Sequence, residues 1–209
     1  MDEMDAKRLE ELKNNSGKTS NGIMMEALSL LSIRELGKMK FSVVFALSFF
    51  LTGFVSIQIK SDVLIKEIAE RWQDVVLAVF GIAFTAHSIF QALLSPQLIY
   101  AMVRANDNEK NDISSFSGTN KYFVSYMMLS FIVIVLNVVI MVCDIIIPEG
   151  WNLFESRYIN SILFFALCFP YFYCSICWLV EMKSVIANIH NMYNVSAIDK
   201  YVDELRKRE

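Results

Sequence analysis

The chain has 209 residues, of which 55% are apolar and 20% carry a charge, and its formal net charge is −3. This composition is too hydrophobic for an ordinary soluble domain. The slightly negative charge excludes the basic field that nucleic-acid binding requires, so no direct contact with nucleic acid is expected. The sequence has no phosphate-binding glycine loop, zinc-protease motif or serine-hydrolase elbow. We therefore expect a non-enzymatic protein without cofactor or metal.

Four apolar blocks without Asp, Glu, Lys or Arg dominate the chain. They cover residues 41–59, 75–94, 122–143 and 158–180. Each is about 20 residues long, which is the length of helix that crosses the hydrocarbon core of a bilayer. Strands are shorter, and lipid does not tolerate an open sheet edge. The sequence thus predicts an all-α integral membrane protein with a four-span domain at 41–180.

The basic residues predict the orientation of these spans. Most Lys and Arg fall in residues 1–40, 95–121 and 181–209, so the positive-inside rule places both termini in the cytoplasm. The tryptophans agree with this topology. Trp72 and Trp151 precede spans two and four, at the expected outer interface, and Trp178 lies at the inner end of span four.

The N-terminal tail, residues 1–40, divides into three parts. A charged helix comes first, followed by a flexible linker at 14–22. Met24, Leu28 and Leu31 then recur at helical spacing, and basic residues follow them. This pattern favours an interfacial helix on the inner leaflet, and the alternative is an extension of span one.

Two loops follow different patterns. In residues 60–74, apolar side chains recur at i, i+3, i+4 and i+7, so this outer segment either rests on the outer leaflet or caps the bundle. Residues 95–121 are rich in Asn, Asp, Ser and Gly, which predicts an irregular cytoplasmic loop, with Pro96 kinking the helix that enters it.

The C-terminal tail, residues 181–209, is predicted to be a cytoplasmic helix with an uncovered apolar stripe. Ser196 to Asp199 resembles a capping box that would start a new helix. A stripe beyond the membrane needs a cover, either a second copy of the chain or a cytoplasmic partner protein. Its residues are Val185, Ile189, Met192, Ile198, Val202 and Leu205.

Span two carries a seam of small residues in steps of three and four. Such a seam lets another helix approach closely. It predicts packing within one subunit, an oligomer interface or a pore lining. The seam consists of Ala78, Gly81, Thr85, Ser88, Ala92 and Ser95.

Four polar residues in or next to the spans are candidate functional groups. His87 and Gln91 flank the seam and are interpreted as interhelical hydrogen-bonding groups, with a gate as the alternative. Asn137 lies within span three, and Asp144 lies at its outer edge, where it reaches water. Cys174 and Cys177 form a C-x-x-C, but without an electropositive neighbour or further ligands they are expected to be structural.

Three functions compete on this evidence. The first is an oligomeric membrane subunit that senses membrane state or an outside contact and anchors a cytoplasmic partner. The second is an oligomeric channel or membrane-permeabilising effector, with Thr85, Ser88 and Gln91 lining the hole. The third is a four-span thiol oxidase, from which the chain departs because its outer segments, 60–74 and 148–157, contain no cysteine.

The overall layout resembles the small four-span membrane subunit of the Kiwa anti-phage defence system. The features that carry the resemblance are the charged N-terminal tail, the span AVFGIAFTAHSIFQALLSP and the helical C-terminal tail. They cover the whole chain as architecture, without a diagnostic motif. The resemblance implies a bacterial inner-membrane sensor that oligomerises and recruits a cytoplasmic, DNA-binding partner subunit.

Overall fold

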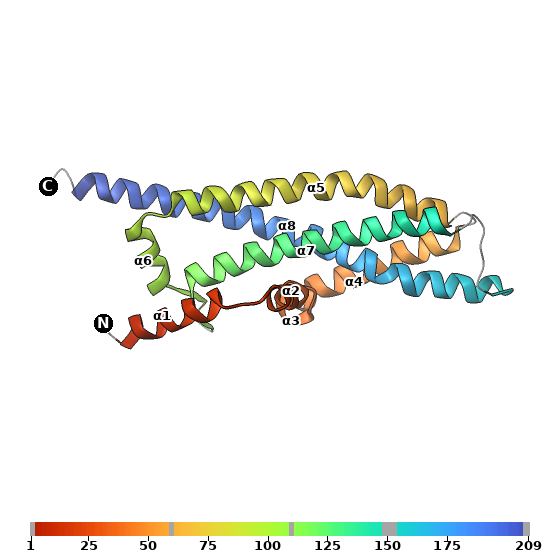
Figure 1. Cartoon of the computed structure of the whole chain (residues 1–209), viewed down its shortest axis with the longest axis horizontal. Coiled ribbons are helices and arrows are strands. Elements are labelled where there is room, and N and C mark those ends of the chain that lie inside the picture. Colours follow the sequence, from red (N-terminus) through yellow and green to blue (C-terminus); the bar gives the residue numbers. More distant parts are fainter. Residues whose placement is uncertain (1–2, 59–60, 109–110, 148–153, 207–209) are drawn as a thin grey trace.

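Four long helices lie side by side in the computed structural model, which describes residues 3–58, 61–108, 111–147 and 154–206 (Figure 1). The elements in chain order are α1 (Glu3–Ser16), α2 (Ser20–Ser29), α3 (Ile33–Leu36), α4 (Lys38–Ile57), α5 (Ser61–Leu93), α6 (Pro96–Arg104), β1 (Asn106–Asn108), β2 (Asn111–Ser114), α7 (Ser115–Ile146) and α8 (Arg157–Arg206).

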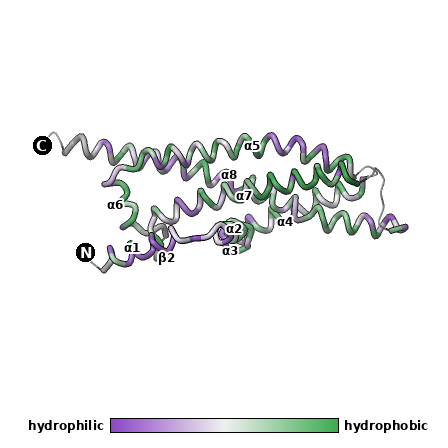
Figure 2. Tube along the Cα trace, viewed as in Figure 1, coloured by the Kyte–Doolittle hydropathy of each residue, from purple (hydrophilic) through white to green (hydrophobic). Residues whose placement is uncertain are grey.

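The long helices α4, α5, α7 and α8 are, among the described residues, those long and apolar enough to cross a membrane. Hydrophobic residues run along all four (Figure 2). The predicted all-α class with four apolar helices is confirmed. However, α5, α7 and α8 have 33, 32 and 50 residues and extend well beyond the predicted spans. Both α1 and the last turns of α8 lie at one end of the molecule, which we call the tail end (Figure 1).

Two helix pairs build the bundle: α4 packs along α8, and α5 packs along α7. Aromatic rings spaced four residues apart hold α4 to α8, because a step of four keeps side chains on one helix face. The ring centroids are 6.3 Å apart for Phe41–Tyr173, 5.4 Å for Phe45–Phe169 and 5.2 Å for Phe49–Phe165.

Trp178 joins three helices at the centre of the core. Its ring stacks on Tyr126 of α7 with centroids 6.2 Å apart and meets the edge of Trp72 of α5 at 5.9 Å. Its indole N–H donates to the Ser130 hydroxyl at 2.8 Å. Trp72 was expected at the outer interface and Trp178 at the inner one, but the contact between their rings puts both at one depth, so they do not mark opposite interfaces. Trp151 lies outside the described residues.

Residues 61–74 are the first turns of α5, and a separate outer segment at this place was a wrong expectation. Ile65 and Ala69 are buried, while Ile68 and Trp72 are half-buried in the core clusters. This apolar face therefore caps and extends the bundle, and it does not rest on the outer leaflet. The helical period runs on unbroken into residue 75 because no Gly or Pro interrupts it.

At the tail end, the described residues between 95 and 121 form helix and strand, where an irregular loop was expected. Pro96 starts α6, where its missing N–H costs nothing, and the Ser95 hydroxyl caps the helix by accepting from the amide of Leu98 at 3.0 Å. The strands β1 and β2 pair antiparallel, with Asn106 opposite Ser114. The Ser114 hydroxyl then caps α7 by accepting from the amide of Ser117.

The N-terminal tail turns sharply before α4. Gly37 has φ +75° and separates α3 from α4, so the segment before it is not an extension of span one. In Figure 1, α2 runs across the long helices. Ala27 of α2 is buried, and α2 packs on α7.

Candidate functional site

The small-residue seam of α5 lies on the surface of the chain. Five of its six residues are exposed, and Ser95, which caps α6, is half-buried. A Cβ added at Gly81 would meet no atom within 4 Å. Packing within one subunit therefore does not explain this seam, and the oligomer and pore alternatives are left. The exposed members are Ala78, Gly81, Thr85, Ser88 and Ala92.

The hydroxyl groups of this seam are satisfied inside α5. Thr85 Oγ1 donates to the carbonyl of Gly81 at 2.8 Å, and Ser88 Oγ donates to the carbonyl of Phe84 at 3.0 Å. A hydroxyl that bonds to its own helix does not need water as a partner. The seam can therefore meet another apolar helix face without leaving a donor unpaired.

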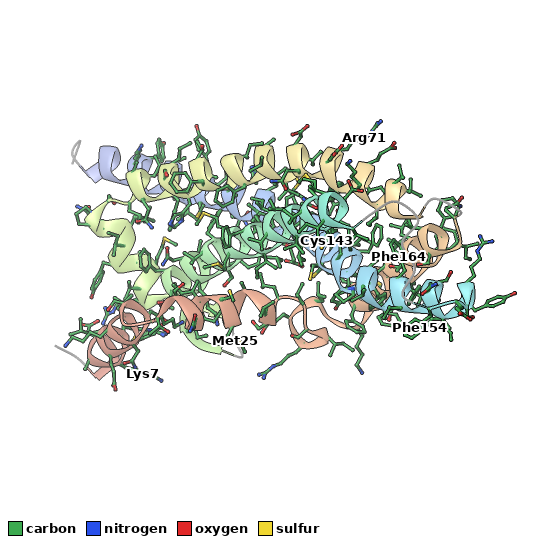
Figure 3. All side chains as sticks on the ribbon, turned by 45° about the vertical axis from the view of Figure 1, so that its right-hand side comes forward. Lys7, Met25, Arg71, Cys143, Phe154 and Phe164 are labelled. Carbon is green, nitrogen blue, oxygen red and sulfur yellow. The ribbon has the colours of Figure 1, made fainter. Side chains whose placement is uncertain are left out.

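The exposed face of α5 continues from the seam into a charged band, which we define as Glu67, Glu70, Arg71 and Asp74. All four residues are exposed. Counting back from Ala78 in steps of four and three reaches Asp74, Arg71 and Glu67 in turn, so the band and the seam share one face. Figure 3 shows Arg71 pointing away from the bundle. We missed this continuity from sequence because residues 60–74 were predicted to be an outer segment and not the first turns of the second long helix.

The two predicted polar groups of span two lie on the side of α5 that meets α7. Gln91 Nε2 donates to Asn120 Oδ1 of α7 at 3.4 Å, which is the interhelical bond expected for it. His87 instead packs its ring 5.8 Å from that of Phe123, and its buried Nδ1 has no hydrogen-bond partner in the described part of the chain. The interhelical hydrogen bond expected for His87 Nδ1 is thus absent there.

The polar residues of α7 find partners on α5. Asn137 is fully buried, and its Nδ2 donates to Gln73 Oε1 at 2.9 Å. Asp144 forms an ion pair with Lys66, with Oδ2 and Nζ 2.7 Å apart. Sequence reasoning missed Gln73 and Lys66. Gln73 and Lys66 are seven residues apart, as are Asn137 and Asp144. This equal spacing in the sequence could have predicted that the two pairs meet between neighbouring helices.

A buried carboxylate links three helices nearer the tail end. Glu181 of α8 is only 6% exposed and accepts a 2.6 Å hydrogen bond from the Tyr122 hydroxyl of α7. Lys40 Nζ of α4 lies 3.4 Å from the other carboxylate oxygen. A buried charge needs such partners, so this cluster fixes the register of α4, α7 and α8. Sequence reasoning missed it.

The cysteines lie in different environments. All four are free thiols. Cys177 is buried, and its thiol lies 3.7 Å from the carbonyl of Leu30, while Cys174 is half-buried against the core. No group of three His, Cys, Asp or Glu side chains within the described residues could hold a metal ion. These positions match the structural role expected for the pair.

The first part of the C-terminal stripe is covered by the chain itself. Val185 is buried, and Ile189 and Met192 pack on the same core cluster, so the expectation that they lack a cover is wrong. α8 also continues unbroken through Ser196, which is buried and starts no new helix. Ile198 is exposed, whereas the side chains of Val202 and Leu205 lie outside the described residues.

Other apolar side chains are exposed at the tail end. Tyr193, Ile198 and Tyr201 of α8 are 66%, 63% and 67% exposed, and Tyr100 of α6 is 54% exposed. Tyr193, Ile198 and Tyr201 lie on the last turns of α8, and Tyr100 lies on the neighbouring α6. They form a surface that a partner protein can cover.

α1 is fastened to the start of α7. Glu11 accepts hydrogen bonds from the amide and the hydroxyl of Ser114, both at 3.0 Å, and from buried Arg8 at 2.8 Å. Burial acts to raise the pKa of Glu11, but the hydrogen bonds from Arg8 and Ser114 outweigh it and hold this pKa below its ordinary value of 4.5. The carboxylate also lies at the positive end of the α7 dipole.

Comparison of the chain with protein-family models, with curated proteins and with solved structures finds no match in any of the three.

Proposed function

We propose that this chain is a non-enzymatic membrane subunit that associates with copies of itself through the seam of α5. The observation that carries the proposal is the exposure of five small residues in helical register. Lipid tails solvate apolar side chains as well as another helix does, so association in a bilayer depends on close backbone approach between small residues. The seam offers that approach.

The other long helices present a different surface. Exposed positions on α4 carry large side chains such as Phe49, Phe50 and Phe54, and those on α7 carry Val138 and Val139. These side chains suit contact with lipid. α5 also exposes large side chains such as Ile82 and Phe84, but they flank the seam, and the row of five exposed small residues between them supports association through α5.

The test replaces Gly81 with leucine. No atom lies within 4 Å of a Cβ at this position, so the new side chain starts from open space, and leucine is a better helix former than glycine by somewhat less than about 1 kcal/mol. We expect fewer subunits per complex, counted by stepwise photobleaching in native membranes. Ala46→Leu on the exposed surface of α4 is the matched control and keeps the wild-type count. A wild-type count for Gly81→Leu contradicts the proposal.

We also propose that the tail end lies in the cytoplasm and holds a partner protein there. The exposed Tyr193, Ile198 and Tyr201 support this surface. The resemblance to the Kiwa membrane subunit suggests the partner's class, a DNA-binding subunit in the cytoplasm of a bacterium. On this proposal the assembly responds to membrane state or to a contact from outside.

Replacing Tyr193, Ile198 and Tyr201 with serine tests this surface without removing Val185 from the core. Proteins that co-purify after gentle detergent extraction are compared with those of the wild type. We expect the partner to be lost while the subunit count stays the same. Recovery of the same partner by the triple variant contradicts this part of the proposal.

A channel is the second candidate, and the observation that favours it is the polarity of the exposed α5 face. Thr85 and Ser88 lie on that face together with the charged band. Planar-bilayer recording of the purified complex decides the matter. Unitary currents that change with the side chain at Thr85 support a pore, whereas a complex that is silent under every stimulus excludes it.

A further inference from the structure

The charged band of α5 lies at a depth where neighbouring helices present apolar side chains. Gln73, at the level of the band, is hydrogen-bonded to Asn137 of α7. Asn137 lies seven residues from Asp144, which corresponds to about 10 Å along the helix. Around Asn137, the exposed residues Val135, Val138 and Val139 face outward.

The contact between α4 and α5 also indicates that the charged band lies at the depth of apolar side chains. Val55, near the end of α4, packs in one cluster with Ile65 of α5. α4 has 20 residues, so it is about 30 Å long and matches the thickness of the hydrocarbon core. From Ile65 the α5 helix runs back alongside α4, and Arg71 and Asp74 lie about 9 and 13 Å further along it.

Charges at this depth require partners. Exposed charged side chains in the hydrocarbon region are costly, and in membrane proteins they face other helices or water. No ion pair in the described part of the chain involves Glu67, Glu70, Arg71 or Asp74. Among the described residues, the same subunit therefore supplies no ion-pair partner for this band.

The band carries both signs of charge, one guanidinium and three carboxylates, so a guanidinium of one copy can meet a carboxylate of the next. Copies of one chain insert in the same direction, so a given residue meets its neighbour's residues of similar depth. Arg71 carries the positive charge, and Asp74 lies one helical turn away on the line that leads into the seam. A guanidinium forms two parallel hydrogen bonds to a carboxylate, which suits a desolvated contact.

We propose that Arg71 of one copy pairs with Asp74 of the adjacent copy, and that this ion pair, together with the seam, is the interface between subunits. The inference rests on the proposed self-association through α5. Glu70 offers a second acceptor to the same guanidinium. Glu67 follows Lys66, which pairs with Asp144 at the end of the span, and it reaches the aqueous boundary there.

The test is a charge swap read out by cross-linking. Ser88→Cys in a Cys143→Ser chain reports contact between seams, because disulfide formation in membranes requires two copies to meet there. Into this chain we introduce Arg71→Asp, Asp74→Arg, or both. We expect each single reversal to weaken association at least about tenfold and the double swap to restore it. Arg157→Asp, at an exposed position that starts α8, is the control and leaves association unchanged.

Neutral variants keep the test decisive if a reversal prevents folding. Arg71→Gln and Asp74→Asn each remove the pair without adding a like-charge contact, and both are expected to weaken association. Wild-type cross-linking in every variant would mean that the band faces a water-filled vestibule, which overturns the ion pair and leaves the seam intact. If the Ser88→Cys chain that keeps the wild-type band forms no cross-link between copies, this result would instead overturn self-association itself.

Discussion

Asn137 of α7 donates a hydrogen bond to Gln73 of α5 across 2.9 Å, about 10 Å along α7 from the ion pair of Lys66 and Asp144. These two polar links fix α5 and α7 in one register. They also place the charged band of α5 level with apolar side chains of α7. The register is the structural fact on which the interface proposal depends.

Replacing Asn137 with leucine should lower the stability of the folded chain in detergent by about 0.6–1.7 kcal/mol, the range measured for interhelical hydrogen bonds. The variant leaves the Gln73 amide without its partner. Adding Gln73→Leu removes that unpaired group, so the double variant should be no less stable than Asn137→Leu. Thermal unfolding of purified protein gives the comparison. Strictly additive losses would show that the bond does not couple the two sites.

Replacing Gly37 with alanine should destabilise the junction of α3 and α4 by about 1–3 kcal/mol, because φ at this residue is +75°. Gly81→Ala is the matched control. Neither position has an atom within 4 Å of a new Cβ, so the two variants differ in backbone conformation and not in crowding. Gly81→Ala should be neutral or slightly stabilising. Equal thermal stability of the two variants would contradict the role of Gly37.

Acid should release α1 from α7. The pKa of Glu11 is below 4.5 in the folded protein, so the undocked carboxyl group binds a proton first as the pH falls. The stabilisation from Glu11 is therefore complete above about 4.5 and is lost as the pH falls through the lower, folded value. A spin label on Ala6, which is exposed, should become mobile over that interval.

The conservative variant Glu11→Gln tests the same contact at neutral pH. It should mobilise the label on Ala6 without acid, because an amide is a weaker acceptor for Arg8 and Ser114. Glu10→Gln changes an exposed residue of the same helix and should leave the label immobile. A label in Glu11→Gln as immobile as in the wild type would refute the docking role of Glu11.

Cysteine labelling should report the predicted orientation of the chain. Glu155 lies in the connection before α8, and Lys13 lies in α1, so the two mark opposite ends of the bundle (Figure 1). In a Cys143→Ser chain, we expect a membrane-impermeant maleimide to label Glu155→Cys on intact cells. Lys13→Cys should react only after permeabilisation. The reverse pattern would place both termini outside.

Much of the architecture follows from sequence alone. Blocks such as 41–59 and 122–143 are too long and too apolar for anything but helices in lipid, since a lipid-exposed backbone must satisfy its own hydrogen bonds. The small residues of α5 were visible in the same way, because helical spacing is a local property. The sequence therefore determined the four long apolar helices and the residues that share each of their faces.

The depth of each helix relative to the others was decided by tertiary contacts. Hydropathy placed residues 60–74 outside the bilayer because they are charged, yet Ile65 and Trp72 on the same segment are drawn into the core. Val185 was likewise expected to lack a cover, but α8 packs on α7 and Val185 is buried in the core cluster that they share. Which face a neighbour covers depends on residues far away in the chain, such as Asn137 for Gln73, and a local pattern does not contain that information.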